Sequence, residues 1–155
     1  MARRDELLRE EDGAWGRLNS LLDEIPDERM TEPGLTEDWT VKDLLGHLAY
    51  WMAEAAHVFE RQHYNTYEKS SLDVDAINAD VYQAMKDLDL STVRTELDSA
   101  RVRMLQEWWA LPELTPEAEE WFMESGAGHL DEHLPDLERF VRSKVEIPGI
   151  HPTRP

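Results

Sequence analysis

The sequence contains no cysteine among its 155 residues. This absence excludes disulfides, thiolate metal ligands and a cysteine nucleophile, so any thiol chemistry must use a thiol brought in from outside the chain. Long apolar runs are also absent, and no stretch approaches the ~20 consecutive apolar residues of a membrane span. The N-terminus carries no apolar segment of the secretory type, and the sequence therefore predicts a cytoplasmic protein without a membrane partner.

Positive charge is scarce as well. Lys and Arg together number 16 against 34 Asp and Glu, which gives a formal net charge of −18. Such a chain repels phosphate backbones and anionic lipid headgroups unless a local basic patch overrides the mean charge. The densest basic cluster is Arg94, Arg101 and Arg103, and it is interleaved with Glu96 and Asp98. This pattern is typical of a solvated helix face, so nucleic acid is excluded as a partner.

Apolar residues recur at steps of three and four through most of the chain, and no segment shows the alternation of a strand. The spacing predicts helices over residues 3–25, 41–62, 73–109 and 116–145, the third interrupted near 87–91. Helices of about 20 residues span ~30 Å, the height of a four-helix bundle. The predicted fold class is therefore all-α, a four-helix bundle.

Capping residues support these boundaries. Thr40 followed by Asp43 resembles a capping box at the start of the second helix, and Ser91 can cap the resumed third helix. Gly126 and Gly128 mark a soft start or break in the last helix. The length suits one domain, predicted over residues 1–147, with a loose tail over 148–155.

Six histidines are the residues most capable of chemistry: His47, His57, His63, His129, His133 and His151. The i, i+4 spacing of His129 and His133 stacks two imidazoles on one helix face, where they can reach one metal or can simply be surface residues. Asp136 falls on the same face, either to orient a ligand or to lie in solvent. His47 lies at the edge of its helix's apolar stripe, and a lone histidine there is more often structural than a ligand.

Six tryptophans are a high number for this length. Most are expected in the core or in a pocket wall, and Trp39 precedes the second helix, whose start it can staple. Trp108 and Trp109 point about 100° apart on one helix, so they do not easily face a single core. One of the two is expected at a dimer interface or in an exposed patch.

Two segments resemble a known family. "GLTEDWTVKDLLGHLAYW" (residues 34–51) and "GHLDEHLPDLERF" (residues 128–140) are similar to the two histidine motifs of the DinB-like superfamily. The segment between them resembles its third helix, so the resemblance covers nearly the whole chain. Related groups include mycothiol-dependent maleylpyruvate isomerases, bacillithiol S-transferases and cyclopropane-hydrolase-like colibactin self-protection proteins.

The resemblance implies a four-helix bundle, often a homodimer, with a divalent metal held by three side chains. Carried over by position, the ligands are His47, His129 and His133. Zinc or nickel is favoured as the metal, and iron or manganese also accepts three imidazoles. The implied function is a metal-dependent transferase or detoxification enzyme that uses a low-molecular-weight thiol and acts on a small-molecule substrate, as an S-transferase or as an isomerase or hydrolase.

Two alternatives remain open at the level of the sequence. One is a non-catalytic bundle that binds a small ligand or dimerises, and the other is a hydrolase that does not need the metal. The motifs identify no catalytic residue beyond the three ligands. A catalytic member is expected to keep a water-accessible cavity with further polar groups near the histidines, whereas a binding module can lack them.

Overall fold

The structure is a computed structural model that describes residues 2–143. The predicted tail over 148–155 and His151 lie outside the described residues. The elements, in chain order, are α1 (Ala2–Asp23), the short 3-10 helix η1 (Asp27–Arg29), α2 (Val41–His63), α3 (Val74–Met85), α4 (Leu90–Ala110), α5 (Pro116–Ser125) and α6 (Ala127–Ser143). No strand occurs within residues 2–143, so the predicted all-α class is confirmed.

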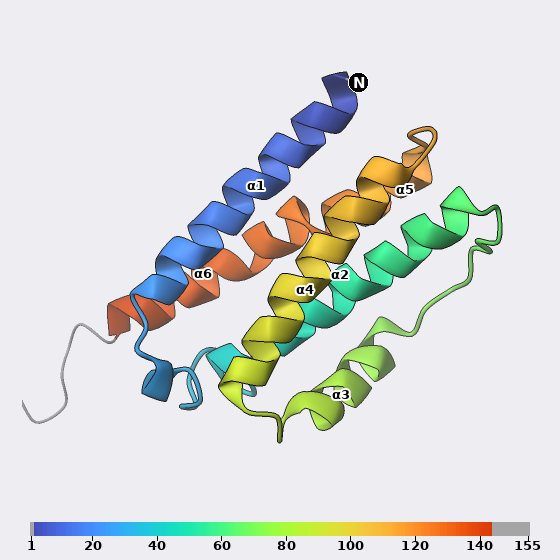
Figure 1. Ribbon diagram of the computed structural model, residues 1–155. Helices are drawn as coiled ribbons and strands as arrows, with labels where there is room; N and C mark the ends of the chain where they lie inside the picture. The colour runs from blue at the N-terminus through green and yellow to red at the C-terminus, as the bar shows by residue number, and fades with distance from the viewer. Residues whose placement is uncertain (1, 144–155) are drawn as a thin grey trace, which may run out of the picture.

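The long helices lie side by side as a bundle (Figure 1). α2 packs along α4, α1 packs along α6, and α5 continues the line of α6 and contacts α2. The shorter α3 packs on α2 at the outside of the bundle. The core is apolar, and its largest fully buried rings are Trp108, Phe59 and Phe122. Trp108 stacks on Phe122 with ring centroids 4.0 Å apart, which joins α4 to α5.

The start of α2 is held by the predicted capping box. The backbone N–H of Asp43 donates to Oγ1 of Thr40 at 3.1 Å, and the N–H of Thr40 donates to the Asp43 carboxylate at 2.9 Å. Both bonds satisfy donors that the first helical turn leaves without partners. The cap therefore sets where α2 begins, and with it the direction of His47 two turns later.

The predicted break in the third helix is a separation into α3 and α4. Asp89, rather than Ser91, caps α4, because its carboxylate accepts the N–H of Thr92 at 2.8 Å. The Ser91 hydroxyl donates to Asp89 at 3.1 Å, so the predicted serine cap is wrong. The two residues compete for the same role, and the carboxylate is the stronger acceptor for backbone donors.

The predicted last helix is likewise two helices, α5 and α6, with Gly126 between them. Its backbone torsions of φ −108° and ψ −114° are not helical. A Cβ atom at Gly126 would lie 2.7 Å from the Phe122 carbonyl oxygen and 3.1 Å from Cγ of Glu11. The close approach of α1 thus requires glycine here, and the break fixes where α6 and its two histidines begin.

The basic cluster on α4 is not wholly a solvated face. The guanidinium of Arg101 donates to both carboxylate oxygens of Glu11, at 2.7 and 2.8 Å, and the Glu11 side chain is fully buried. Arg101 also lies over the Trp15 ring, 4.6 Å from its centroid. The prediction of solvated charge is therefore wrong for Arg101, because the packing of α1 against α4 encloses it.

The adjacent tryptophans diverge as their helical angle predicts. Trp108 is fully buried, whereas Trp109 is 44% exposed. The placement of Trp109 at a dimer interface stays a prediction. Separately, no helix within the described residues is long and apolar enough to cross a membrane.

Candidate metal centre

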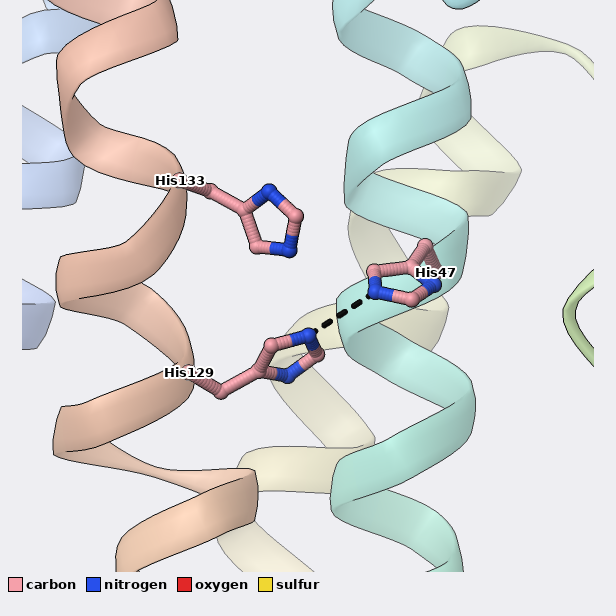
Figure 2. A group of neighbouring side chains, drawn as sticks. All are labelled: His47, His129 and His133. Carbon is pink, nitrogen blue, oxygen red and sulfur yellow. Dashed lines mark hydrogen bonds between the residues drawn. The ribbon is translucent and has the colours of Figure 1, made fainter. Parts of the chain in front are cut away.

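Three histidines from two helices point toward one another. His47 projects from the second turn of α2, and His129 and His133 project from successive turns of α6 (Figure 2). The ring centroids are 4.7 Å apart for His47–His129, 5.2 Å for His47–His133 and 4.9 Å for His129–His133. The structure therefore brings together the three residues on which the resemblance placed the metal, although they lie far apart in the chain.

The separation of the ring nitrogens suits one ion. The Nε2 atoms of His47 and His129 are 2.8 Å apart, a hydrogen bond in which one ring donates and the other accepts. One nitrogen from each of the three rings can be chosen so that all lie within 4.8 Å of one another. Two imidazoles that share a tetrahedral ion at 2.0–2.1 Å hold their nitrogens ~3.4 Å apart, a value between these two separations. The three side chains could therefore hold a metal ion.

The burial of His129 points the same way. This residue is only 9% exposed, and its Nε2 atom faces His47, whereas its Nδ1 atom has no hydrogen-bond partner among the described residues. Buried polar groups are costly unless a partner satisfies them, and an ion beside Nε2 would provide one for that nitrogen. The arrangement fits a metal centre better than a pair of surface histidines.

Burial also keeps the histidines in the protonation state that binds metals. It lowers the pKa of His47 to about 4, against an opposing effect of Asn78, and the nearby His133 lowers this pKa further. Burial lowers the pKa of His129 to about 3, helped by the positive charge that His47 or His133 would carry. The pKa of His133 is also lowered by burial, although Glu132 and Asp136 oppose this. Neutral imidazoles offer lone pairs to a metal.

The histidines lie in the wall of a cavity of about 660 Å³ between α2, α3, α5 and α6. Polar groups other than the imidazoles also line it: Asn78, Glu124, Ser125 and Glu132. These are the further polar groups expected of a catalytic member. Three tryptophans contribute apolar wall, and the Trp39 ring lies 4.7 Å from that of His47, so Trp39 is a site residue as well as a neighbour of the α2 cap.

Asn78 is one of the cavity residues that the sequence did not single out, together with Glu124, Ser125 and Glu132. Its Oδ1 accepts the indole N–H of Trp51 at 2.8 Å, which ties α3 to α2 beside His47. No motif marks it, because α3 is short and its relation to α2 depends on tertiary packing. The glycine at position 46 of α2 is the one sequence feature connected with this packing. A Cβ there would lie 2.8 Å from Sδ of Met85, because α3 approaches α2 closely at that point.

The other candidates lie apart from the cluster. His57 is exposed, and His63 lies against Tyr64 at the end of α2. Asp136 accepts a hydrogen bond from Arg139 at 2.7 Å in a surface ion pair, and within the described residues it forms no hydrogen bond with any of the three clustered histidines. Its effect on the site is electrostatic, through the pKa of His133.

Together the fold and the histidine cluster define a DinB-like helical bundle with a candidate metal centre. The chain belongs to the mycothiol maleylpyruvate isomerase N-terminal domain family, whose model matches residues 12–141 and so includes all three histidines. No curated protein and no solved structure matched the chain. The family is part of the DinB-like superfamily that the two histidine motifs resemble.

Proposed function

We propose that the protein is a divalent-metal-dependent enzyme that joins a low-molecular-weight thiol to a small electrophilic molecule, as a transferase or detoxification enzyme. The observation that carries this proposal is the convergence of His47, His129 and His133 in the wall of a cavity. Membership of a family named for a mycothiol-dependent enzyme supports it. Mycothiol is accordingly the first thiol to test.

The three histidines would act as neutral ligands. Their lowered pKa values keep protons off the ring nitrogens at neutral pH. A zinc or similar ion held by these three residues would supply Lewis acidity and would lower the pKa of a water or thiol bound to it toward neutrality. Nitrogen ligands of this kind suit zinc or nickel, with iron or manganese as alternatives.

The remaining groups of the cavity would position the reactants. The indole N–H of Trp51 donates to Oδ1 of Asn78, which holds the Asn78 side chain in the cavity beside His47. The amide N–H groups of Asn78 would then be able to donate to a substrate. The chain contains no cysteine, so the nucleophilic sulfur is that of the external thiol. A new bond forms from sulfur to the electrophilic carbon, the leaving group departs with its electron pair, and the thiol proton passes to solvent.

A non-catalytic role is the competing interpretation. A bundle that only binds a ligand or only dimerises has no need for three unprotonated imidazoles beside an open cavity with further polar side chains. The presence of Asn78, Ser125 and two glutamates in that cavity therefore favours catalysis. A hydrolase that does not need the metal would keep its activity when any one of the three histidines is replaced. Histidine variants therefore distinguish it from a metal-dependent transferase.

The test combines metal analysis with a thiol-consumption assay. Protein purified without chelators is analysed for bound metals by mass spectrometry, then assayed with mycothiol and a panel of alkyl halides and epoxides. We expect near one ion per chain and metal-dependent thiol loss. The His47→Ala variant should lose both, with helical content by circular dichroism unchanged.

The matched control is His57→Ala, which removes an exposed histidine from the same helix. It should keep both metal and activity. Failure of the wild-type chain to retain any of the four metals, or thiol consumption that survives His47→Ala, would overturn the proposal.

A further inference from the structure

The cavity beside the histidines has an unusual charge for a site that would accept an organic acid. Among the described residues that line the cavity, none is Lys or Arg, but two are glutamates, Glu124 and Glu132. Neither glutamate forms an ion pair within residues 2–143. The side-chain charge that a ligand meets there is therefore negative.

The rest of the wall is apolar. It is formed by Trp39, Trp51, Leu72, Val74, Trp121 and Met123. Leu72 is 43% exposed and Val74 47% exposed, which places them among the few large hydrophobic side chains within residues 2–143 that face solvent. Exposed apolar groups that gather around a cavity mark a binding surface, because a ligand with apolar surface removes them from water.

A divalent ion held by three neutral imidazoles would add two positive charges, which the carboxylates of Glu124 and Glu132 around the same cavity would offset. The loaded cavity would therefore carry no net positive charge that attracts an anion. A carboxylate in the cavity away from the ion would lose its hydration without meeting a Lys or Arg side chain, which is costly.

We propose that this cavity accepts an uncharged, largely apolar electrophile and rejects substrates that carry a carboxylate. That the ligand is an electrophile rests on the proposed function, but the preference for uncharged ligands rests on the cavity alone. It separates this chain from the dicarboxylate in its family's name, since maleylpyruvate would bring two negative charges to a wall without a Lys or Arg side chain.

Binding is tested on metal-free protein with two probes of nearly the same shape, the neutral 4-methylbenzamide and the anionic 4-methylbenzoate. Dissociation constants are measured by nuclear magnetic resonance titration that follows the indole N–H signals of Trp51 and Trp121. We expect the amide to bind at least tenfold more tightly than the carboxylate. Equal or tighter binding of the carboxylate, or no shift of these signals with the amide, would overturn the proposal.

Variants assign the preference to the residues named. Replacing both acids (Glu124→Gln with Glu132→Gln) should reduce the ratio of the two dissociation constants to below threefold. Leu72→Arg, at an exposed position, should tighten carboxylate binding several-fold. Glu138→Gln removes a carboxylate from α6 away from this cavity, and it should leave the ratio unchanged. A ratio that stays tenfold in the double variant contradicts the assignment.

The kinetic arm uses metal-loaded protein and mycothiol with 4-(bromomethyl)benzamide and 4-(bromomethyl)benzoate. We expect kcat/KM for the amide to exceed kcat/KM for the carboxylate at least tenfold, after each is corrected for the rate of its reaction without enzyme. If no metal binds but the probe ratio holds, the proposed function fails and the cavity preference stands. If thiol transfer occurs with both electrophiles equally well, the proposed function stands and the cavity preference fails.

Discussion

The carboxylate of Glu11 in α1 accepts two hydrogen bonds from the guanidinium of Arg101 in α4, at 2.7 and 2.8 Å, without any exposure to solvent. The Arg101 side chain is 16% exposed and is covered on one side by the Trp15 ring. A two-bond pair of this geometry fixes the position of one helix along the other. Glu11 also packs against the break between α5 and α6, because a Cβ at Gly126 would lie 3.1 Å from its Cγ atom.

Removing the Glu11 carboxylate should be strongly destabilising. Glu11→Ala leaves the enclosed Arg101 charge with only the exposed Asp12 beside it, and loss of one member of a buried pair costs about 3–5 kcal/mol. Urea unfolding followed by circular dichroism measures the change. The Glu11→Ala, Arg101→Ala double variant should lose less than the sum of the single changes, because no unpaired charge remains.

Asp12→Ala provides the control for this prediction. Asp12 also approaches Arg101, at 3.4 Å, but its side chain is 77% exposed. A pair this exposed contributes ~1 kcal/mol or less. Comparable losses for Glu11→Ala and Asp12→Ala would show that burial does not determine the contribution of the pair.

Much of this architecture follows from local patterns. The apolar stripe predicted the second helix over 41–62 and the structure has Val41–His63, because the Thr40 cap and the stripe are properties of that segment alone. The break near 87–91 was predicted for the same reason. The position of the cap was wrong, because Asp89 and Ser91 both satisfy a local rule and only one can act.

What escaped prediction depends on the partner helix. The spacing of His129 and His133 shows that they share a face, but not that α2 presents His47 to that face. The resemblance supplied that step. Glu11, Arg101 and Asn78 have no distinguishing pattern, since each becomes buried or becomes part of the site only when another helix covers it.

The metal-free protein should lose stability as the pH falls. Burial places the pKa of His47 at about 4 and that of His129 at about 3, both below the ordinary 6.5 of the unfolded chain. At pH values between the folded and the unfolded pKa, the unfolded state binds more protons than the folded state. The free energy of unfolding therefore falls as the pH falls, by up to about 1.4 kcal/mol per pH unit for each such histidine. The window from pH 6.5 to 5 lies above the ordinary carboxylate pKa range.

Denaturant unfolding at several pH values in a chelating buffer measures this slope. The His47→Ala variant should lose about one histidine's share of it and should bring the pKa of His129 and His133 closer to 6.5. His57→Ala should keep the wild-type slope, because His57 is exposed. Stability that does not change between pH 6.5 and 5 contradicts the prediction.

Association through α4 stays a prediction of the sequence. Trp109 is 44% exposed and Val102, two turns earlier on the same face, is 53% exposed. We expect light scattering to give the mass of a homodimer and Trp109→Asp to give a monomer with unchanged helical content. A strict monomer of the wild-type chain at high concentration would remove this prediction.

The last prediction compares two glycines in opposite environments. At Gly126 a Cβ would meet the Phe122 carbonyl oxygen at 2.7 Å and Glu11 at 3.1 Å, whereas at Gly16, inside α1, it would meet nothing within 4 Å. Gly126→Ala should therefore destabilise the fold by about 1–3 kcal/mol through overpacking. Gly16→Ala should stabilise it by ~0.5–1 kcal/mol, because alanine has the higher helix propensity. Thermal unfolding measures both changes.

The two variants should also differ in metal binding. Gly126 precedes His129 by less than one helical turn, so a shift of the backbone at the α5–α6 break moves both histidines of α6 relative to His47. Zinc affinity, measured by competition with a chromophoric chelator, should fall at least tenfold in Gly126→Ala and stay at the wild-type value in Gly16→Ala. Unchanged affinity in Gly126→Ala would mean that the break does not position the histidines, whatever its effect on stability.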